Sequence, residues 1–173
     1  MRRLSLLSFF VFFILSAFSP LPIHAAWEQK ELGTIQGLRG ITQSGNAMIA
    51  VGNTGNILRS VDQGMTWGVV DKNATVYWQD ADTNDATVRV VGEGGAMRES
   101  TDNGSTWTNV VLGVSENIYD IQTLGAYGFL VGSGGRIMSL HPTAKLWQTV
   151  TSPTTLALQR VHMVSESTAW IVG

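Results

Sequence analysis

Two octapeptides place a carboxylate, two hydroxyls, a glycine and an indole at the same spacing. They share the pattern S-x-D-x-G-x-T-W over residues 60–67 and 100–107. An aspartate in a tight turn accepts backbone N–H bonds, the glycine takes a positive φ at low steric cost, and the tryptophan buries a large ring. This spacing therefore indicates hairpin closure and packing, not ligand binding. The residues concerned are Ser60, Asp62, Gly64 and Trp67 in the first copy and Ser100, Asp102, Gly104 and Trp107 in the second.

No other set of residues has the spacing of a catalytic or metal site. His141 and His162 are isolated, so they form no metal-binding set. A pair of carboxylates for glycoside hydrolysis cannot be chosen from spacing alone. The glycine-rich stretches 92–95 and 132–135 resemble phosphate loops, but no helix follows them, which favours hairpin turns. We expect no catalytic residue, no metal and no small-molecule cofactor.

The elements that position these residues repeat about every 40 residues. Val-Gly pairs fall at 51, 91, 131 and 172, and tryptophans at 27, 67, 107 and 147. Each period holds four short runs rich in Val, Ile, Thr and aromatic residues, separated by turn-forming residues. Four strands in about 40 residues are typical of one blade of a β-propeller. The sequence therefore predicts an all-β propeller of four-stranded blades.

Three full blades are expected, over about residues 38–70, 76–112 and 118–150. The first strand of the second blade is expected at Val76–Asp80. An outer strand over 27–32 precedes the full blades, and a half blade over 158–173 follows them. Since propellers usually have about four to eight blades, we expect a piece of a larger ring. The alternative is a four-bladed ring that closes with the strand at Trp27.

The N-terminus has the pattern of a secretory signal peptide over residues 1–25. Arg2 and Arg3 precede an uncharged apolar run, and Ala25-Ala26 offers a small-residue cleavage site. The run is short for a bilayer-spanning helix, and an uncleaved anchor is the alternative. We expect export to a periplasm, a lumen or the extracellular space. The chain has no cysteine, so a disulfide and a lipid-anchored lipoprotein are both excluded.

The charge balance limits the kinds of partner. Without Arg2 and Arg3 the chain keeps 9 basic and 13 acidic residues, and this acidic balance argues against nucleic acid. Charged residues make up only 14% of the chain and 19 of its 173 residues are glycine, a composition that suits short strands and tight turns.

The two octapeptides resemble the Asp-box, also called the bacterial neuraminidase repeat. The units join them to V-G-x-x-G-x-[IM], and this combination is similar to the photosystem II assembly/stability factor family of seven-bladed propellers and its relatives outside photosynthesis. The resemblance covers the chain from Trp27 onward, and seven blades would need about 300 residues. It implies an exported, non-catalytic scaffold that binds a protein partner, such as a membrane protein segment, during membrane-complex assembly. The third copy, which ends at Trp147, has lost both the Asp and the Gly.

The Asp-box is also found in sialidases, which gives a second hypothesis. Those enzymes need an arginine cluster and a tyrosine nucleophile with a glutamate partner. Their arginine-bearing F/Y-R-I-P stretch is missing here, and Tyr77, Tyr119 and Tyr127 have no evident glutamate partner. A fragment of a sialidase-like or other carbohydrate-active propeller, or a glycan-binding module without hydrolysis, remains the alternative function.

A partner is expected where the loops ring the central channel. The positions 12 residues before the Val-Gly pairs are Arg39, Gln79, Tyr119 and Arg160. We expect them to begin the innermost strands, lie together near the channel mouth and be flanked by turns at 53–54, 93 and 133. Arginine and tyrosine are enriched at protein-binding hot spots. The alternative is that both arginines are solvated blade edges.

Overall fold

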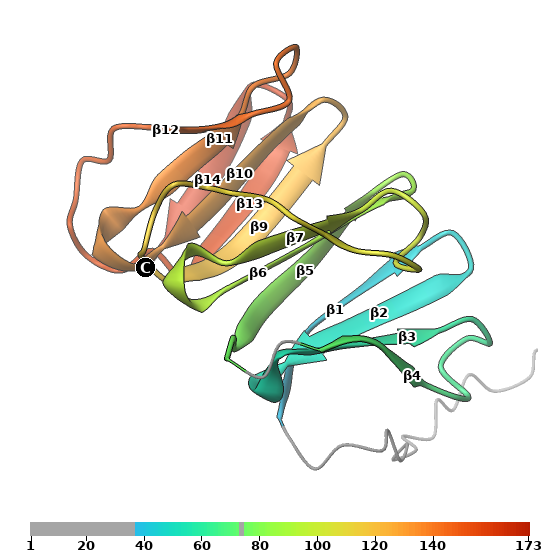
Figure 1. Ribbon diagram of the computed structural model, residues 1–173. Coiled ribbons are helices and arrows are strands. Elements are labelled where there is room, and N and C mark those ends of the chain that lie inside the picture. Colours follow the sequence, from blue (N-terminus) through green and yellow to red (C-terminus); the bar gives the residue numbers. More distant parts are fainter. Residues whose placement is uncertain (1–36, 73–74) are drawn as a thin grey trace, which may run out of the picture.

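The computed structural model describes residues 37–72 and 75–173, and these form strands, turns and three one-turn 3-10 segments. The strands make four antiparallel sheets that follow one another along the chain and fan out side by side (Figure 1). This confirms the predicted all-β, partial β-propeller fold built from four-stranded blades. The signal peptide expected over 1–25 and the outer strand expected over 27–32 lie outside the described residues.

Each of the first three blades is a four-stranded meander in chain order. Blade 1 contains β1 (Leu38–Ser44), β2 (Ala47–Gly52), β3 (Asn56–Ser60) and β4 (Gly68–Lys72). Blade 2 contains β5 (Trp78–Asn84), β6 (Thr87–Gly92), β7 (Met97–Ser100) and β8 (Thr108–Asn109). Blade 3 contains β9 (Ile118–Leu124), β10 (Tyr127–Gly132), β11 (Ile137–Leu140) and β12 (Trp147–Thr149). A two-stranded sheet follows, with β13 (Arg160–Ser165) and β14 (Thr168–Val172).

The first strand of blade 2 differs from the sequence prediction of Val76–Asp80. It starts at Trp78 and continues to Asn84, which pairs with Thr87 of β6. The polar residues after Asp80 carry no apolar signal for a strand. They are nevertheless extended, because they pair with β6 and their side chains bind the neighbouring blade, as described below.

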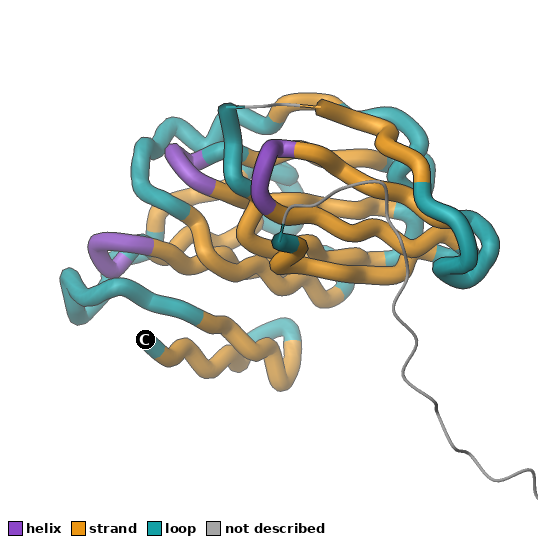
Figure 2. Tube along the Cα trace, turned by 90° about the horizontal axis from the view of Figure 1, so that it is seen from below, coloured by secondary structure: helices purple, strands orange, loops and turns teal. Residues whose placement is uncertain are grey.

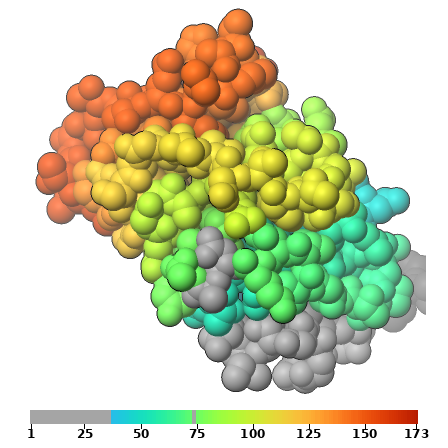
Figure 3. Space-filling model, in the orientation of Figure 1, coloured from blue at the N-terminus to red at the C-terminus, as the bar shows by residue number. Residues whose placement is uncertain are grey.

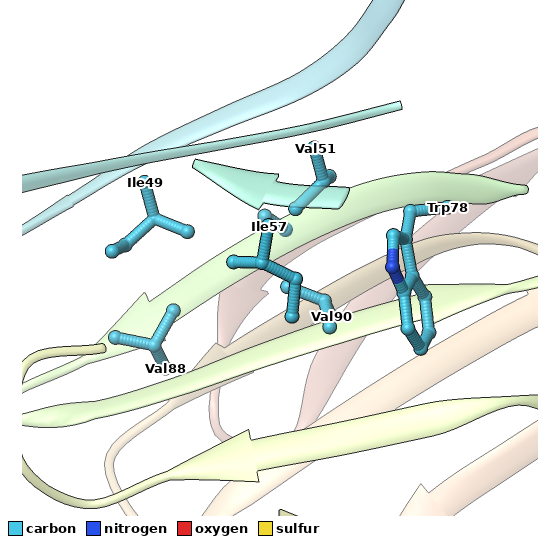
Figure 4. Close-up of a cluster of buried hydrophobic side chains, with 7 residues drawn as sticks. Ile49, Val51, Ile57, Trp78, Val88 and Val90 are labelled. Atoms are coloured by element: carbon cyan, nitrogen blue, oxygen red, sulfur yellow. The ribbon is translucent and has the colours of Figure 1, made fainter. Parts of the chain in front are cut away.

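The core consists of three apolar clusters, one between each pair of neighbouring sheets. Alternation along the strands explains this, because successive side chains point to opposite faces. Val88 and Val90 of β6 face blade 1, whereas Val91 faces blade 3. The first cluster joins Ile49, Val51, Ile57, Trp78, Ala81, Val88 and Val90 (Figure 4). Because both faces of a sheet are covered by its neighbours, blades are stabilised by each other rather than singly.

Among the described residues, Trp78 is the largest fully buried side chain. It was not among the tryptophans singled out by the 40-residue period. Its side chain is 1% exposed, and its Nε1 donates to the carbonyl of Gly55 in blade 1 at 3.1 Å. Trp107 and Trp147 are only partly buried, and they pack against the clusters between blades 1 and 2 and between blades 2 and 3.

The Val-Gly pair recurs because its glycine lies close to the start of the first strand in each blade. A Cβ placed on Gly52, Gly92 or Gly132 would lie 2.0–2.5 Å from the carbonyl oxygen of the residue before that strand. No residue with a side chain fits so close to this carbonyl oxygen. The second glycine of V-G-x-x-G ends each 3-10 segment at a positive φ, 71° at Gly95 and 70° at Gly135, which glycine adopts without the steric cost of a Cβ.

The first strands of the sheets form the inner side of the fan. β1 packs on β5, β5 on β9 and β9 on β13. The space-filling view shows the blades in contact in chain order, from blue-green through yellow to orange (Figure 3). This arrangement brings residues about 40 positions apart into direct contact.

The two Asp-containing turns have the same hydrogen-bond pattern. In the second, Asp102 Oδ1 accepts from the backbone N of Thr106 at 2.9 Å, and Asp102 Oδ2 accepts from its hydroxyl at 2.7 Å. Ser100 Oγ donates to Asp102 at 2.7 Å and accepts from the N of Gly104 at 2.9 Å. Trp107 Nε1 closes the turn on the carbonyl of Gly104 at 3.1 Å. The equivalent bonds hold the turn of Ser60, Asp62, Gly64, Thr66 and Trp67.

Replacing Asp102 with asparagine is expected to lower Tm at pH 7, because an amide offers one acceptor oxygen where the carboxylate offers two. The backbone bond from Thr106, with those from Ser100 and the Thr106 hydroxyl, lowers the pKa of Asp102 from 3.8 to about 2. The stabilisation is therefore present above pH 4 and lost as the pH falls toward 2. Thermal melts at pH 7 and pH 2.5 should show the gap between variant and parent closing at the lower pH. An equal gap at both would contradict this role.

The third turn is built differently. Pro142 and Ala144 stand where the first two turns have Asp and Gly. His141 Nδ1 accepts from the N of Ala144 at 3.0 Å, and Lys145 adopts a φ of 54°. A shorter local hydrogen-bond pattern thus replaces the Asp-centred one, and Trp147 still follows it.

Candidate functional site

Three of the four residues predicted as a partner-binding column are β-bulge residues. The pairing of β1 with β2 skips Arg39, that of β5 with β6 skips Gln79, and that of β9 with β10 skips Tyr119. A bulge re-aims a side chain and is over-represented next to functional sites. The structure therefore places these residues at equivalent points of three neighbouring blades, at the start of each inner strand.

The register corrects the fourth member of the column. In the last hairpin Arg160 pairs with Val172, as Asp120 pairs with Val131, so Arg160 is the equivalent of Asp120 and Gln159 that of Tyr119. The cause is an irregularity in that hairpin between Met163 and Ser165, which lengthens the spacing to the Val-Gly pair by one residue. Arg160 still reaches back to the column, with Nη1 3.4 Å from the carbonyl of Tyr119. We call Arg39, Gln79, Tyr119 and Gln159 the bulge row.

The bulge row and the 3-10 segments lie at the same end of the blades. The first residue of each segment donates its N–H to the residue before the neighbouring inner strand, as Asn53 does to the Gly37 carbonyl at 3.0 Å and Ser133 does to Asn117 at 2.9 Å. Figure 2 shows the three segments, η1 (Asn53–Gly55), η2 (Glu93–Gly95) and η3 (Ser133–Gly135), as purple turns. The predicted flanking turns therefore border the row.

Arg39 is held in place by two neutral side chains. Its Nε donates to Asn53 Oδ1 at 2.9 Å, and its Nη1 donates to Gln79 Oε1 at 3.0 Å. Arg39 is exposed, and it lines a shallow hollow together with Asn53, Thr54, Tyr77 and Glu93. Tyr77, which the sequence did not connect with this face, is 47% exposed. An oriented guanidinium beside an exposed aromatic ring can bind a carbonyl-rich, partly apolar ligand.

A second set of residues was missed from the sequence and follows the bulge row along the inner strands. Asp80 Oδ2 accepts from the backbone N of Ile121 at 3.2 Å. Asp120 Oδ2 accepts from the N of Val161 in the same way, at 2.6 Å. Further along the strands, Asp82 Oδ2 accepts from the N of Thr123 at 2.7 Å, and Gln122 Oε1 from the N of Met163 at 2.5 Å. Their common signal is a polar residue 41 positions before the inner-strand residue that donates to it.

These side chains satisfy backbone donors on the free edge of each inner strand, so their role is structural. Blade 1 has Gly40 at the position of Asp80 and Asp120, because a Cβ there would lie 2.8 Å from the N of Ala81. Thr42 occupies the position of Asp82 and Gln122 and makes the inter-blade contact there, with its hydroxyl 2.9 Å from that of Thr83. Buried polar groups that are paired in this way fix the register of one blade against the next.

Asp80 has the most perturbed acid–base equilibrium of this inner set. Burial, followed by the charge and hydrogen bond of neighbouring Asp120, raises the pKa of Asp80 from 3.8 to about 7. Burial also raises the pKa of Asp82. Arg160 Nη1 lies 3.7 Å from Asp120 Oδ1, at the exposed end of the set. A proton held on Asp80 can therefore be donated in its hydrogen bond with Asp120.

Within residues 37–72 and 75–173, no group of three or more His, Asp or Glu side chains could hold a metal ion. In the same part of the chain, no helix is long and apolar enough to cross a bilayer.

Comparisons with known proteins identify the fold. No protein-family model matches the sequence, and no curated protein matches it either. Among solved structures, YCF48 bound to D1 peptide is 19% identical, with a TM-score of 0.67 over 76% of this chain and 45% of that one. YCF48 from Cyanidioschyzon merolae is 24% identical, with a TM-score of 0.66 over 75% and 44%. The computationally designed Ika4 protein is 11% identical, with a TM-score of 0.62 over 85% and 100%. The chain thus spans less than half the length of the YCF48 chains that it matches.

Proposed function

We propose that this chain is a non-catalytic, exported propeller scaffold that binds a polypeptide segment of a protein partner during membrane-complex assembly. The observation that carries the proposal is the bulge row, which aims an oriented arginine and neighbouring polar and aromatic side chains outward from one end of the blades. Its propeller fold is shared with YCF48, one structure of which holds a D1 peptide. The resemblance of the sequence to photosystem II assembly factors with Asp-box repeats supports the same assignment.

The chemistry of the face suits an extended peptide. Asn53 and Gln79 engage two of the five N–H donors of Arg39. The guanidinium is therefore oriented before binding, which lowers the entropy cost of recognising backbone carbonyls or a carboxylate. Tyr77 supplies an exposed ring in the same hollow. Arg160, on β13 three sheets further along the chain, adds a second exposed cation.

A structural use for the buried acids supports a non-catalytic role. Asp80, Asp82 and Asp120 each accept a backbone N–H from the next blade. Carboxylates that hold the framework in this way are poorly placed to act as a nucleophile or a proton donor. Export is proposed from the signal-peptide pattern of residues 1–25.

Site-specific photocrosslinking tests the binding face. A photoreactive phenylalanine analogue replaces Tyr77 in the hollow or, as control, Val111, which is 91% exposed on the connection after β8. In cells that produce the protein, we expect position 77, and not position 111, to crosslink to a discrete polypeptide. Mass spectrometry of the adduct identifies the segment.

Replacing Arg39 and Arg160 together with alanine is expected to reduce this crosslink by about tenfold or more, in line with arginine hot spots, without lowering Tm. Lys145→Ala removes one exposed cation from the opposite end of the blades and should leave the crosslink intact. Equal labelling from positions 77 and 111, or an unchanged crosslink in the double variant, would refute the assignment of this face.

A further inference from the structure

The loss of the Asp-centred turn in blade 3 has changed the junction between blades 2 and 3. At the first junction, the turn of blade 2 reaches across to blade 1. Asn103, at a φ of 55°, accepts from Ser44 Oγ through Oδ1 at 2.8 Å, and its carbonyl accepts from Arg59 Nε at 2.9 Å. Gly104 lies so near Ile49 that a Cβ would be 2.3 Å from Ile49 Cδ1. The turn thus fills the space between the two blades.

At the second junction, the equivalent turn stays within its own blade. The described hydrogen bonds of the loop that precedes Trp147 join His141 to Ala144, Lys145 and Leu146 only. A hollow of about 390 Å³ opens there between the blades. It lies at the opposite end of β5 from the bulge row, because it is bordered by Asn84 and the hairpin after it. Its polar and aromatic lining includes Asn84, Asp85, Arg89, Glu99, Lys145 and Trp147.

We propose that this hollow binds a neutral saccharide of one or two rings. Its volume falls in the range of small-ligand pockets, roughly 300–1,000 Å³. The lining holds two carboxylates and two cations. The hollow therefore has no net charge that would attract an ionic ligand. Sugar hydroxyls both donate and accept hydrogen bonds, which matches a lining of mixed donors and acceptors. Trp147 and Leu140 offer apolar surface for the C–H groups of a sugar ring.

A charged pair in the lining favours a polar ligand for this hollow. Arg89 and Glu99 face each other across β6 and β7, with Arg89 Nε 2.8 Å from Glu99 Oε2 and side chains 11% and 29% exposed. Ile49 and Arg59 occupy the same two positions in blade 1, so this charged pair is particular to blade 2.

Titration calorimetry with the full chain tests the proposal. The probes are glucose, galactose, N-acetylglucosamine and their β-linked dimers, with sialic acid as an anionic comparison. We expect at least one neutral probe to bind with a stoichiometry of one and to change Trp fluorescence, and sialic acid to bind more weakly. Binding by none of the neutral probes, or tighter binding of sialic acid, would overturn the proposal.

A loop graft gives the sharpest variant. Replacing residues 140–146 with the sequence of residues 100–106 restores the Asp-centred turn, which is expected to fill the hollow and to reduce affinity by about tenfold or more. Glu99→Gln should have a similar effect while keeping side-chain volume. Arg39→Ala at the other end of the blades should leave sugar affinity unchanged, and this separates the inference from the proposed peptide face. Undiminished affinity in a graft with a native circular dichroism spectrum would refute it.

Discussion

Replacing Trp78 with alanine is expected to lower the free energy of unfolding by about 3–5 kcal/mol, the cost of emptying a buried aromatic site. The side chain is part of the cluster between blades 1 and 2, and its Nε1 donates to the Gly55 carbonyl. Alanine leaves both a cavity and an unsatisfied carbonyl. Urea denaturation followed by circular dichroism measures the change.

Trp170→Ala is the matched control for this large-to-small change. Trp170 is 69% exposed on β14, so the same truncation there is expected to cost less than about 0.5 kcal/mol. Trp78→Phe should fall between the two, since it keeps a ring and loses only the hydrogen bond and part of the volume. If the Trp78 and Trp170 truncations cost the same, the packing between blades 1 and 2 described above is wrong.

Lowering the pH from 8 to about 5 is expected to stabilise the fold, and Asp80 is the main cause. Its pKa is raised to about 7 in the folded state from 3.8. Between those values the folded protein holds a proton that the unfolded chain has released. The stabilisation is therefore fully present below about pH 4 and is lost as the pH rises through 7, with a total of ~4 kcal/mol. The raised pKa of Asp82 acts in the same direction.

Asp80→Asn is expected to flatten this pH dependence and to be more stable than the parent at pH 8. The amide can donate to Asp120, as the protonated acid does, and it keeps an oxygen for the N–H of Ile121. Asp85→Asn removes the same charge at an exposed position one residue beyond β5 and should leave the slope unchanged. Urea midpoints at pH 5, 6, 7 and 8 give the slopes, and an unaltered slope in Asp80→Asn would disprove the assignment.

The fold was predictable because its information is local and repeated. The Val-Gly pair is needed wherever an inner strand starts close to a 3-10 segment, and this need recurs at Gly52, Gly92 and Gly132. The Asp-centred turns likewise follow from bonds within seven residues of sequence. Features of this kind can be recognised from spacing, and they led to the correct architecture.

The other features could not be predicted from the sequence, because they depend on contacts between blades. The spacing of residues within one repeat gives no information about such contacts. Arg160 was placed one position off because one irregularity in the last hairpin moved the Val-Gly pair relative to β13. Asp80 and Asp120 could not be assigned a partner from spacing within one repeat, because each accepts from a backbone N–H 41 residues later. Trp78 lies off the period of the other tryptophans, although its position is apolar in the neighbouring blades, as at Ile118. The hollow at the second junction is open because the third turn does not reach across to the neighbouring blade.

The inner-strand contacts bear on how such a chain grows by gene duplication. The acceptors on β9, Asp120 and Gln122, accept from main-chain N–H groups of the following inner strand. A tandem copy inserted by unequal crossing-over would present the same main-chain donors whatever its side chains. Newly duplicated units could therefore dock without compensating mutations, and later drift, like that of the third turn, could give individual junctions new ligands.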